Sequence, residues 1–157
     1  MGDDLGGIRL IDVSELNSAA VRAVFEYWQG KCAPGALPAS RTLDPLEMPR
    51  LLPHLLLKDV QRDPWDFRYR VVGTLVREHS RYDWTGKWMS EIDGQGPGSI
   101  LFRVTQWVAE EARPAIYRPP YVGPHKQFKH CEAALMPWVD ASGRTDRVLV
   151  AADFLTS

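Results

Sequence analysis

LPASRTLDPLEMPRLLPHLLLKDVQRDPWDFRYRVVG, the stretch from residue 37 to residue 73, contains the pattern that decides the fold. Its apolar run from Leu55 to Val60 is short, so we predict a largely buried strand there. Phe67, Tyr69 and Val71 alternate with Arg68, Arg70 and Val72, which indicates a second strand with one buried face. Asp63-Pro64 between the two runs favours a turn. We therefore expect an antiparallel pair of strands.

The same stretch contains the start of a short helix. Asp44 is placed to cap it, Pro45 occupies the first position, where a missing N–H does no harm, and Glu47 stands where a capping-box carboxylate belongs. Pro49 and Pro53 each remove a backbone donor. We expect this helix to be short and the chain to continue into the strand after Pro53.

A longer helix is predicted before this stretch, with Ser14 as its N-cap and its end near Gly30. Residues 1–13 show no periodicity and are expected to form a loose arm, unless Ile8, Leu10, Ile11 and Val13 pack an extended segment. Two partners for the helix remain open, because its apolar stripe either packs on the core of this chain or contacts another chain. The stripe comprises Leu16, Ala20, Ala23, Val24 and Tyr27.

Two helices and three strands are predicted after the paired strands, which is an α+β plan. The helices cover Thr74 to Ser80 and Ile100 to Ala112, and the second has an apolar stripe of Ile100, Val104, Trp107 and Val108. The strands are expected at Ala115–Tyr121, Phe128–Trp138 and Val148–Leu155, with a hairpin loop from Asp140 to Asp146.

The order of these segments resembles a family of small bacterial PAS-like proteins, over about residues 27–154. The segments that carry the likeness are Tyr27-Trp28, Pro38-Ala39-Ser40-Arg41, Asp44-Pro45, Leu52-Pro53-His54-Leu55, Phe67 to Thr74 and Thr85-Gly86-Lys87. The resemblance implies a five-stranded antiparallel sheet with helices on one face, enclosing a small cavity, and an N-terminal flanking helix. It divides the chain into an arm and flanking helix, residues 1–36, and a PAS-like domain, residues 37–157. It also implies a homodimer formed through the N-terminal helix.

Charge and cysteine content argue against several classes of protein. The formal net charge is -1, so no overall field draws the chain to nucleic acid or to an anionic membrane. Asp59, Asp63 and Asp66 offset the basic residues that interleave with aromatic residues from Lys58 to Arg70, so we expect no nucleic-acid platform there. The two cysteines form no zinc or disulfide pattern. Without an apolar leader or an 18-residue apolar run, a cytoplasmic protein with no membrane contact is expected.

Histidines and nucleophiles give little sign of catalysis or of a metal site. No GxSxG motif and no set of acid, base and nucleophile is recognisable, so no enzyme is expected. On an extended segment His130 and Cys131 would point to opposite faces, as would His125 and His130, so no metal site is expected from these residues. His79 is the best candidate for a cofactor ligand, such as a haem ligand, or for a polar pocket group; otherwise it is a surface or core histidine.

Large aromatic side chains supply what a buried ligand pocket needs, namely apolar walls with a few polar tips. The alternative is that these side chains simply fill the core. The candidate ligand-binding residues are Tyr69, His79, Trp84, Trp88, Trp107, Met136 and Trp138.

Together these observations predict a stand-alone sensory or regulatory domain that binds a small molecule or a signalling protein and passes on a conformational change. A structural interaction module with a filled core is the first alternative, and a small enzyme is the second. An enclosed void of about 300 Å³ or more, lined by the candidate residues, would favour ligand sensing over the filled module.

Overall fold

The computed structural model describes residues 4–80, 82–121, 123–128 and 130–156. A five-stranded antiparallel sheet with strand order β4-β3-β7-β6-β5 forms its centre. The α+β prediction and the five-stranded sheet are therefore confirmed. The strands are β3 Leu55–Gln61, β4 Asp66–Val72, β5 Ala115–Tyr117, β6 His130–Val139 and β7 Thr145–Leu155.

The pair β3 and β4 is antiparallel, as the stretch from residue 37 to 73 predicts. Arg68 and Arg70 of β4 are exposed, whereas Phe67 and Tyr69 are buried. A bulge moves the register between Leu57 and Lys58. Because of the bulge, Val72 rather than Val71 joins Phe67 and Tyr69 in the hydrophobic core, which corrects the predicted alternation.

The other three strands lie close to their predicted places, with shifted ends. β5 stops at Tyr117 instead of continuing to Tyr121, since Pro119 and Pro120 have no N–H to donate to a neighbouring strand. β6 starts at His130 rather than Phe128, and Lys129 lies outside the described residues. In the hairpin loop that follows, Asp140 accepts hydrogen bonds from the backbone N–H groups of Ser142 and Arg144.

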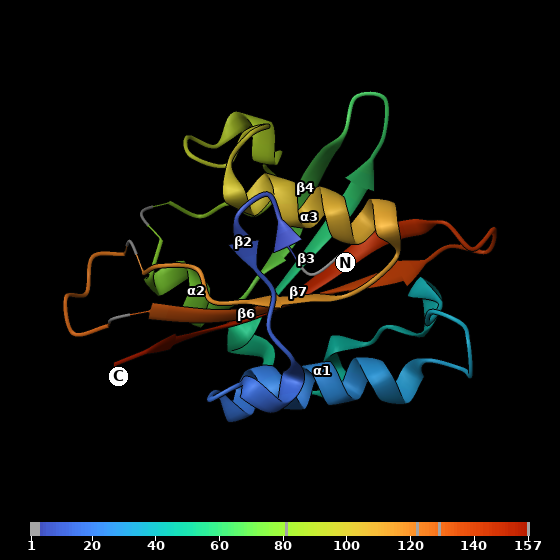
Figure 1. The fold of residues 1–157 in the computed structure, drawn as a ribbon, viewed down its shortest axis with the longest axis horizontal. Coiled ribbons are helices and arrows are strands. Elements are labelled where there is room, and N and C mark those ends of the chain that lie inside the picture. Colours follow the sequence, from blue (N-terminus) through green and yellow to red (C-terminus); the bar gives the residue numbers. More distant parts are fainter. Residues whose placement is uncertain (1–3, 81, 122, 129, 157) are drawn as a thin grey trace.

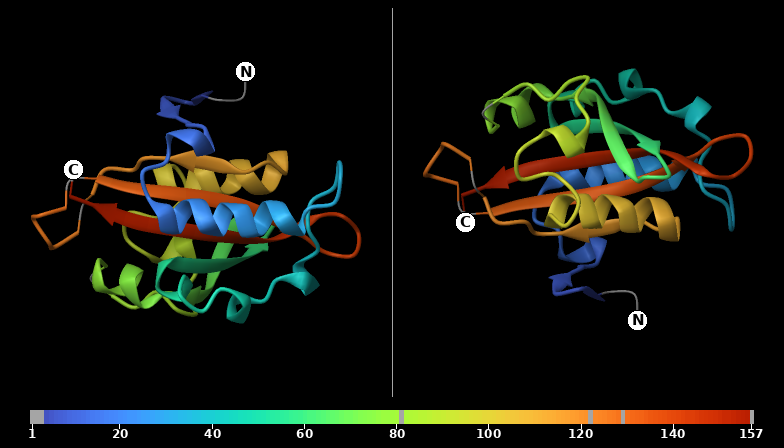
Figure 2. Two further views of the ribbon diagram at one scale, coloured as in Figure 1. Left: turned by 90° about the horizontal axis from the view of Figure 1, so that it is seen from below. Right: turned by 90° about the horizontal axis from the view of Figure 1, so that it is seen from above.

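Helices cover both faces of the sheet (Figure 1, Figure 2). The inner face, as we call it, carries α2 Thr74–Glu78 and α3 Ile100–Glu111, and α1 Ala19–Lys31 lies on the opposite, outer face. Val104 and Val108 of α3 are buried as predicted. Ile100 is 48% exposed, because it stands in the first turn of α3 at the border of an open cavity, so its predicted burial is wrong.

The start of α1 differs from the prediction. Ser18, not Ser14, is its N-cap and accepts a hydrogen bond from the N–H of Val21, whereas Ser14 lies in the 3-10 turn η1 Val13–Glu15. The apolar side of α1 packs on the sheet of its own chain, which is one of the two alternatives that the sequence leaves open. Its buried residues are Val21, Val24, Phe25 and Trp28, while Ala20, Ala23 and Tyr27 of the predicted stripe are only partly buried.

Four further 3-10 turns precede the strands or bridge them: η2 Ser40–Thr42, η3 Pro45–Glu47, η4 Leu52–His54 and η5 Met89–Glu91. The predicted helix at Pro45 is η3, and Asp44 caps it by accepting from the N–H of Leu46. Glu47 does not complete a capping box, because its carboxylate accepts the hydroxyl hydrogen of Tyr27 at 2.6 Å and pairs with Lys31. This contact ties η3 to α1.

Both edges of the sheet are covered by other segments of the chain. At β5, the N–H of Ile11 donates to the carbonyl of Ile116 at 2.8 Å. The preceding hairpin of β1 Asp4–Leu5 and β2 Ile8–Arg9 lies beside α3, so residues 4–13 form a packed, extended segment, which is the second of the two alternatives from the sequence, and not a loose arm. Residues 1–3 lie outside the described residues. At β4, Tyr69 exchanges backbone hydrogen bonds with Gly86 and Lys87.

In the described part of the chain, no helix has the length and apolar character needed to cross a membrane.

Candidate functional site

Buried polar side chains gather between the inner face of the sheet and α3. Lys58 comes from β3, Tyr69 from β4, Thr105 from α3, and Gln95 from the loop that precedes α3. All four are buried, although most of their neighbours are apolar. We call these four residues the inner polar cluster.

Lys58 occupies the centre of this cluster and is 1% exposed. Its Nζ donates to Thr105 Oγ1 at 3.0 Å, and the Thr105 hydroxyl donates in turn to the carbonyl of Leu101. The Nζ also lies 5.2 Å from the centre of the Tyr69 ring, a cation–π distance. The register of the hairpin creates this contact, because it runs unbroken from Gln61 and Asp66 at the turn and makes Tyr69 the partner of Lys58 in the sheet.

The Lys58 amine is buried without a counter-ion. No aspartate or glutamate among the described residues forms an ion pair with it, and burial lowers its pKa to about 7. An ammonium group in such a place lacks the compensation that buried charges normally have. The amine therefore changes between charged and neutral forms close to neutral pH.

Tyr69 extends the cluster toward the segment that follows α2. Its hydroxyl donates to Gln95 Oε1 at 2.6 Å, and the Trp84 ring lies 5.4 Å from its own ring. Burial raises the pKa of the Tyr69 phenol far above its usual value, with a smaller contribution from Tyr117 on β5. Both phenols remain neutral over the physiological range, since burial also raises the pKa of Tyr117.

The candidate residues from the sequence do not form one pocket. Tyr69 and Trp84 meet on the inner face, whereas Met136 and Trp138 belong to the hydrophobic cluster under α1 on the outer face. Trp88 lies beside Arg68 at the β4 edge, and Trp107 of α3 borders an open cavity beside Arg113. Of the candidates, the structure therefore brings only Tyr69 and Trp84 into ring contact, while Trp107 packs elsewhere against the same inner cluster.

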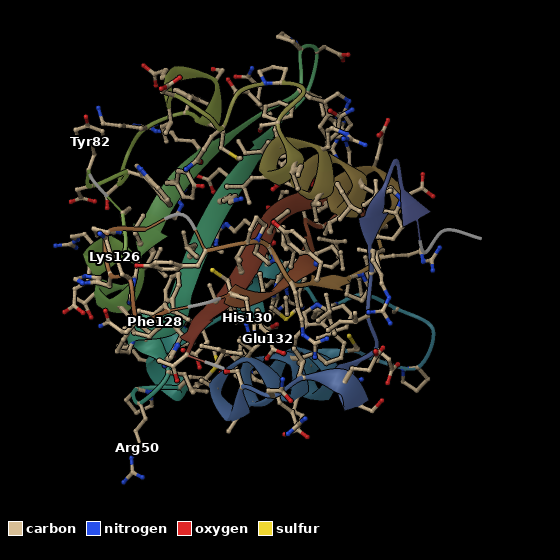
Figure 3. The ribbon with its side chains drawn as sticks, turned by 60° about the vertical axis from the view of Figure 1, so that its left-hand side comes forward. Arg50, Tyr82, Lys126, Phe128, His130 and Glu132 are labelled. Atoms are coloured by element: carbon tan, nitrogen blue, oxygen red, sulfur yellow. The ribbon has the colours of Figure 1, made fainter. Side chains whose placement is uncertain are left out.

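His79 belongs to a separate aromatic cluster at the end of α2. Its ring stacks on Phe154 of β7 with 3.9 Å between the ring centres, and its Nδ1 lies 2.8 Å from the Tyr121 hydroxyl. Burial and the nearby His125 lower its pKa. The described residues contain no group of three potential metal ligands. The cluster instead joins α2 to residues between β5 and β6, because Tyr121, His125 and Phe128 all contact the His79 ring. Figure 3 labels Phe128.

Two open cavities flank the N-terminal segment. One has a volume of about 230 Å³ and lies between Ile11, Phe25 of α1 and Trp107 of α3. The other has a volume of about 340 Å³ and is bordered by Ile8, Ile100 and Tyr117, among others. Neither is lined by Lys58 or Tyr69, and all four residues of the inner polar cluster are buried.

Sequence reasoning misses Lys58 as a site residue, because it treats Lys58 as one of the basic residues that interleave with aromatic residues up to Arg70. A signal is present: Lys58 stands two residues from Leu56 and two from Val60, and alternate residues of a strand share one face. Thr105 and Gln95 carry no such signal, since only the packing of α3 against the sheet brings them to Lys58 and Tyr69.

Glu132 and Asp153 connect the sheet to the start of α1. Glu132 is fully buried on β6 and accepts hydrogen bonds from the backbone N–H groups of Asn17 and Ser18, and Arg118 pairs with it at 3.0 Å. On β7, Asp153 accepts the hydroxyl hydrogen of Ser18 at 2.6 Å. Figure 3 shows Glu132 on the strand just beside α1. The start of α1 is thus fastened to the two central strands.

The comparisons with known proteins agree with this geometry. The family described as "PAS domain" matches residues 16–152. A solved structure, a sensory box sensor histidine kinase from Vibrio cholerae, superposes with a TM-score of 0.51 at 18% identity and covers 71% of this chain and 92% of that one. No curated protein matches the chain. The family match spans most of the sequence, and the structural match shows the same fold, so the chain belongs to the PAS domain family.

Proposed function

We propose that the chain is a sensory or regulatory domain that holds a small molecule between the sheet and α3, at the inner polar cluster, and changes the position of α1 in response. The observation that carries the proposal is the fully buried Lys58 amine, which has no counter-ion among the described residues. A buried polar group that is only partly compensated by its own protein is a common mark of a ligand site.

The strands offer a direct route from the inner face to α1. On β6, Ala133 lies in the inner hydrophobic cluster, and the preceding Glu132 holds the start of α1. On β7, Ala152 packs against the same cluster, and the following Asp153 holds Ser18. Neighbouring residues of a strand point to opposite faces, so Ala133 and Ala152 face the proposed ligand while Glu132 and Asp153 hold α1. A ligand that displaces β6 or β7 therefore moves α1. A second protein or a second copy of the chain would then bind α1 in its new position.

A structural interaction module with a filled core is the second candidate. Phe67, Tyr69 and Met89 are fully buried on the inner face, and the two cavities described above lie elsewhere. In this alternative the domain acts through its surface, and the polar cluster only specifies the packing of the core.

Gentle purification followed by native mass spectrometry and absorption spectroscopy separates the two candidates. The sensory proposal predicts a bound small molecule at a fixed ratio, lost on unfolding, and haem or flavin would be visible in the spectrum. A protein that carries no molecule and that no metabolite extract stabilises against heat would support the filled module. Light scattering of the same samples tests the proposed homodimer.

A further inference from the structure

We infer that the molecule bound at the inner polar cluster is a small organic anion with an apolar body, whose carboxylate pairs with the Lys58 amine. This inference rests on the proposed function and adds the chemical class of the ligand. It follows from three features of Lys58: the N–H groups that lack an acceptor, the lack of a counter-ion among the described residues, and the apolar side chains around the amine.

The hydrogen bonds of Lys58 leave donor capacity unused. A lysine ammonium has three N–H groups, and Thr105 Oγ1 is its one hydrogen-bond acceptor among the described residues. Thr105 has already given its own hydrogen to Leu101, so it serves Lys58 as an acceptor alone. The face of the Tyr69 ring lies nearby but is a weak partner. An incoming carboxylate supplies acceptors for the remaining N–H groups.

The charge of the site favours an anion over a neutral acceptor. The groups that face Lys58 from neighbouring elements are uncharged: Tyr69 on β4, Val148 on β7 and Thr105 on α3. Tyr117 on β5 and Cys131 on β6 also titrate on this side, but burial raises the pKa of each, so both are neutral between pH 6 and 8. A bound carboxylate would therefore be the first counter-ion of Lys58, and pairing would return the amine to its charged form.

The neighbours of the cluster select an apolar ligand body. Phe67, Phe102 and Val104 belong to the same buried cluster as Tyr69 and Val148. Because the residues of the inner polar cluster are all buried, a ligand must displace side chains that now cover the site. The side chain of Tyr69 contacts Trp84 and Gln95, and its backbone is hydrogen-bonded to Gly86 and Lys87. All four lie in the segment of residues 82–99, which contains only one short 3-10 turn. We expect this segment to open for the ligand.

Titration calorimetry with sodium benzoate, isovalerate and octanoate tests the inference at pH 6, 7 and 8. Each pH is measured in two buffers of different ionisation enthalpy, and benzamide serves as the neutral counterpart of benzoate. At least one acid is expected to bind with uptake of a proton at pH 8. Its affinity should fall about fivefold between pH 7 and pH 8, because free Lys58 must then be protonated first.

The variants Lys58→Met and Lys126→Met separate the site from general charge. Lys126 is an exposed lysine in the segment before β6, so its replacement should change nothing. Lys58→Met keeps an apolar chain of similar size, so its melting temperature shows whether the variant folds. It should bind the acid at least tenfold more weakly and without pH dependence.

Three results would overturn the inference. The first is equal binding of the acid by the wild type and by Lys58→Met, and the second is failure of all three acids to bind the wild type at pH 6. The third is a covalent adduct on Lys58 after treatment with borohydride, which would show that the bound molecule is a carbonyl compound joined to the amine as an imine. If the purified protein retains a neutral molecule that moves α1, the sensory proposal stands and only the anionic class is wrong. If no molecule is retained and no extract stabilises the protein, the sensory proposal fails with it.

Discussion

Glu132 and Asp153 lie directly opposite each other on β6 and β7, and both accept hydrogen bonds from Ser18, the N-cap of α1. Glu132 takes the Ser18 backbone N–H at 2.8 Å, and Asp153 takes the hydroxyl at 2.6 Å. Two carboxylates on adjacent central strands thus hold one helix end. The position of α1 depends on the sheet through polar contacts as well as through the apolar packing of its buried side.

Replacing Glu132 by Gln should loosen this connection. The amide keeps one acceptor for the N–H groups of Asn17 and Ser18 but loses the charge that pairs with Arg118. We expect a loss of about 2–3 kcal/mol in the free energy of unfolding, measured with urea. Glu26→Gln, at an exposed position of α1, is the matched control and should stay within about 0.5 kcal/mol of the wild type. Equal stability of both variants would show that Glu132 does not anchor α1.

The stability of the wild type should rise with pH because of Lys58. Its pKa is about 7 in the folded chain against an ordinary value of 10.5, so between these values the unfolded chain binds more protons. The free energy of unfolding of the protein therefore increases above pH 7, and Lys58 contributes up to about 1.4 kcal/mol per pH unit to this increase. Urea denaturation at pH 7, 8 and 9 should show the slope in the wild type and in Lys126→Met, and lose it in Lys58→Met. A slope that persists without Lys58 must come from other groups.

Tyr69→Phe should destabilise the protein by about 1–3 kcal/mol, because it leaves the buried Gln95 amide without its hydroxyl partner. Tyr82→Phe is the control, since Tyr82 is 71% exposed. Thermal and urea unfolding of the two variants give the comparison. The double variant Tyr69→Phe, Gln95→Leu should recover part of the loss, because both polar partners are then removed together. A Tyr69→Phe protein as stable as the wild type would contradict this role of the hydroxyl.

His79→Ala should release the segment between β5 and β6. The ring of His79 stacks on Phe154 and contacts Phe128, and its Nδ1 lies within hydrogen-bond distance of Tyr121. Limited proteolysis should cut His79→Ala faster within residues 118–128, whereas His79→Phe, which keeps a ring, should be cut at an intermediate rate. Because the pKa of His79 is lowered from 6.5, its protonation opposes the folded cluster, and cleavage of the wild type should accelerate below about pH 6.5. Unchanged cleavage in His79→Ala would contradict the proposed support.

The strand pattern is readable from the sequence where side chains alternate between apolar and charged types. The segment from Phe67 to Arg70 shows this alternation, and its pairing with Leu55–Gln61 follows from the short turn between them. The bulge between Leu57 and Lys58 has no such signal, and it decides that Val72 rather than Val71 joins the inner core. Local patterns therefore locate the strands but neither the bulge nor Thr105, the hydrogen-bond partner of the buried amine.

Two other differences also have long-range causes. Ser14 and Ser18 are both suitable N-caps, and contacts with Glu132 and Asp153, more than 110 positions away in sequence, coincide with the choice of Ser18. Met136 and Trp138 have the size expected of pocket walls, but the face on which they lie depends on the register of β6. The aromatic composition indicates a large core without showing that the sheet divides it into two clusters, one under α1 and one under α3.

Hydrogen exchange read by mass spectrometry tests the central claim most directly, when the gently purified protein is compared with the same protein refolded free of small molecules. The account predicts slower exchange in β3, β4 and α3 of the purified form, together with a changed rate at residues 17–21, where α1 begins. Identical exchange in both forms, or differences confined to the surface around the two open cavities, would contradict it.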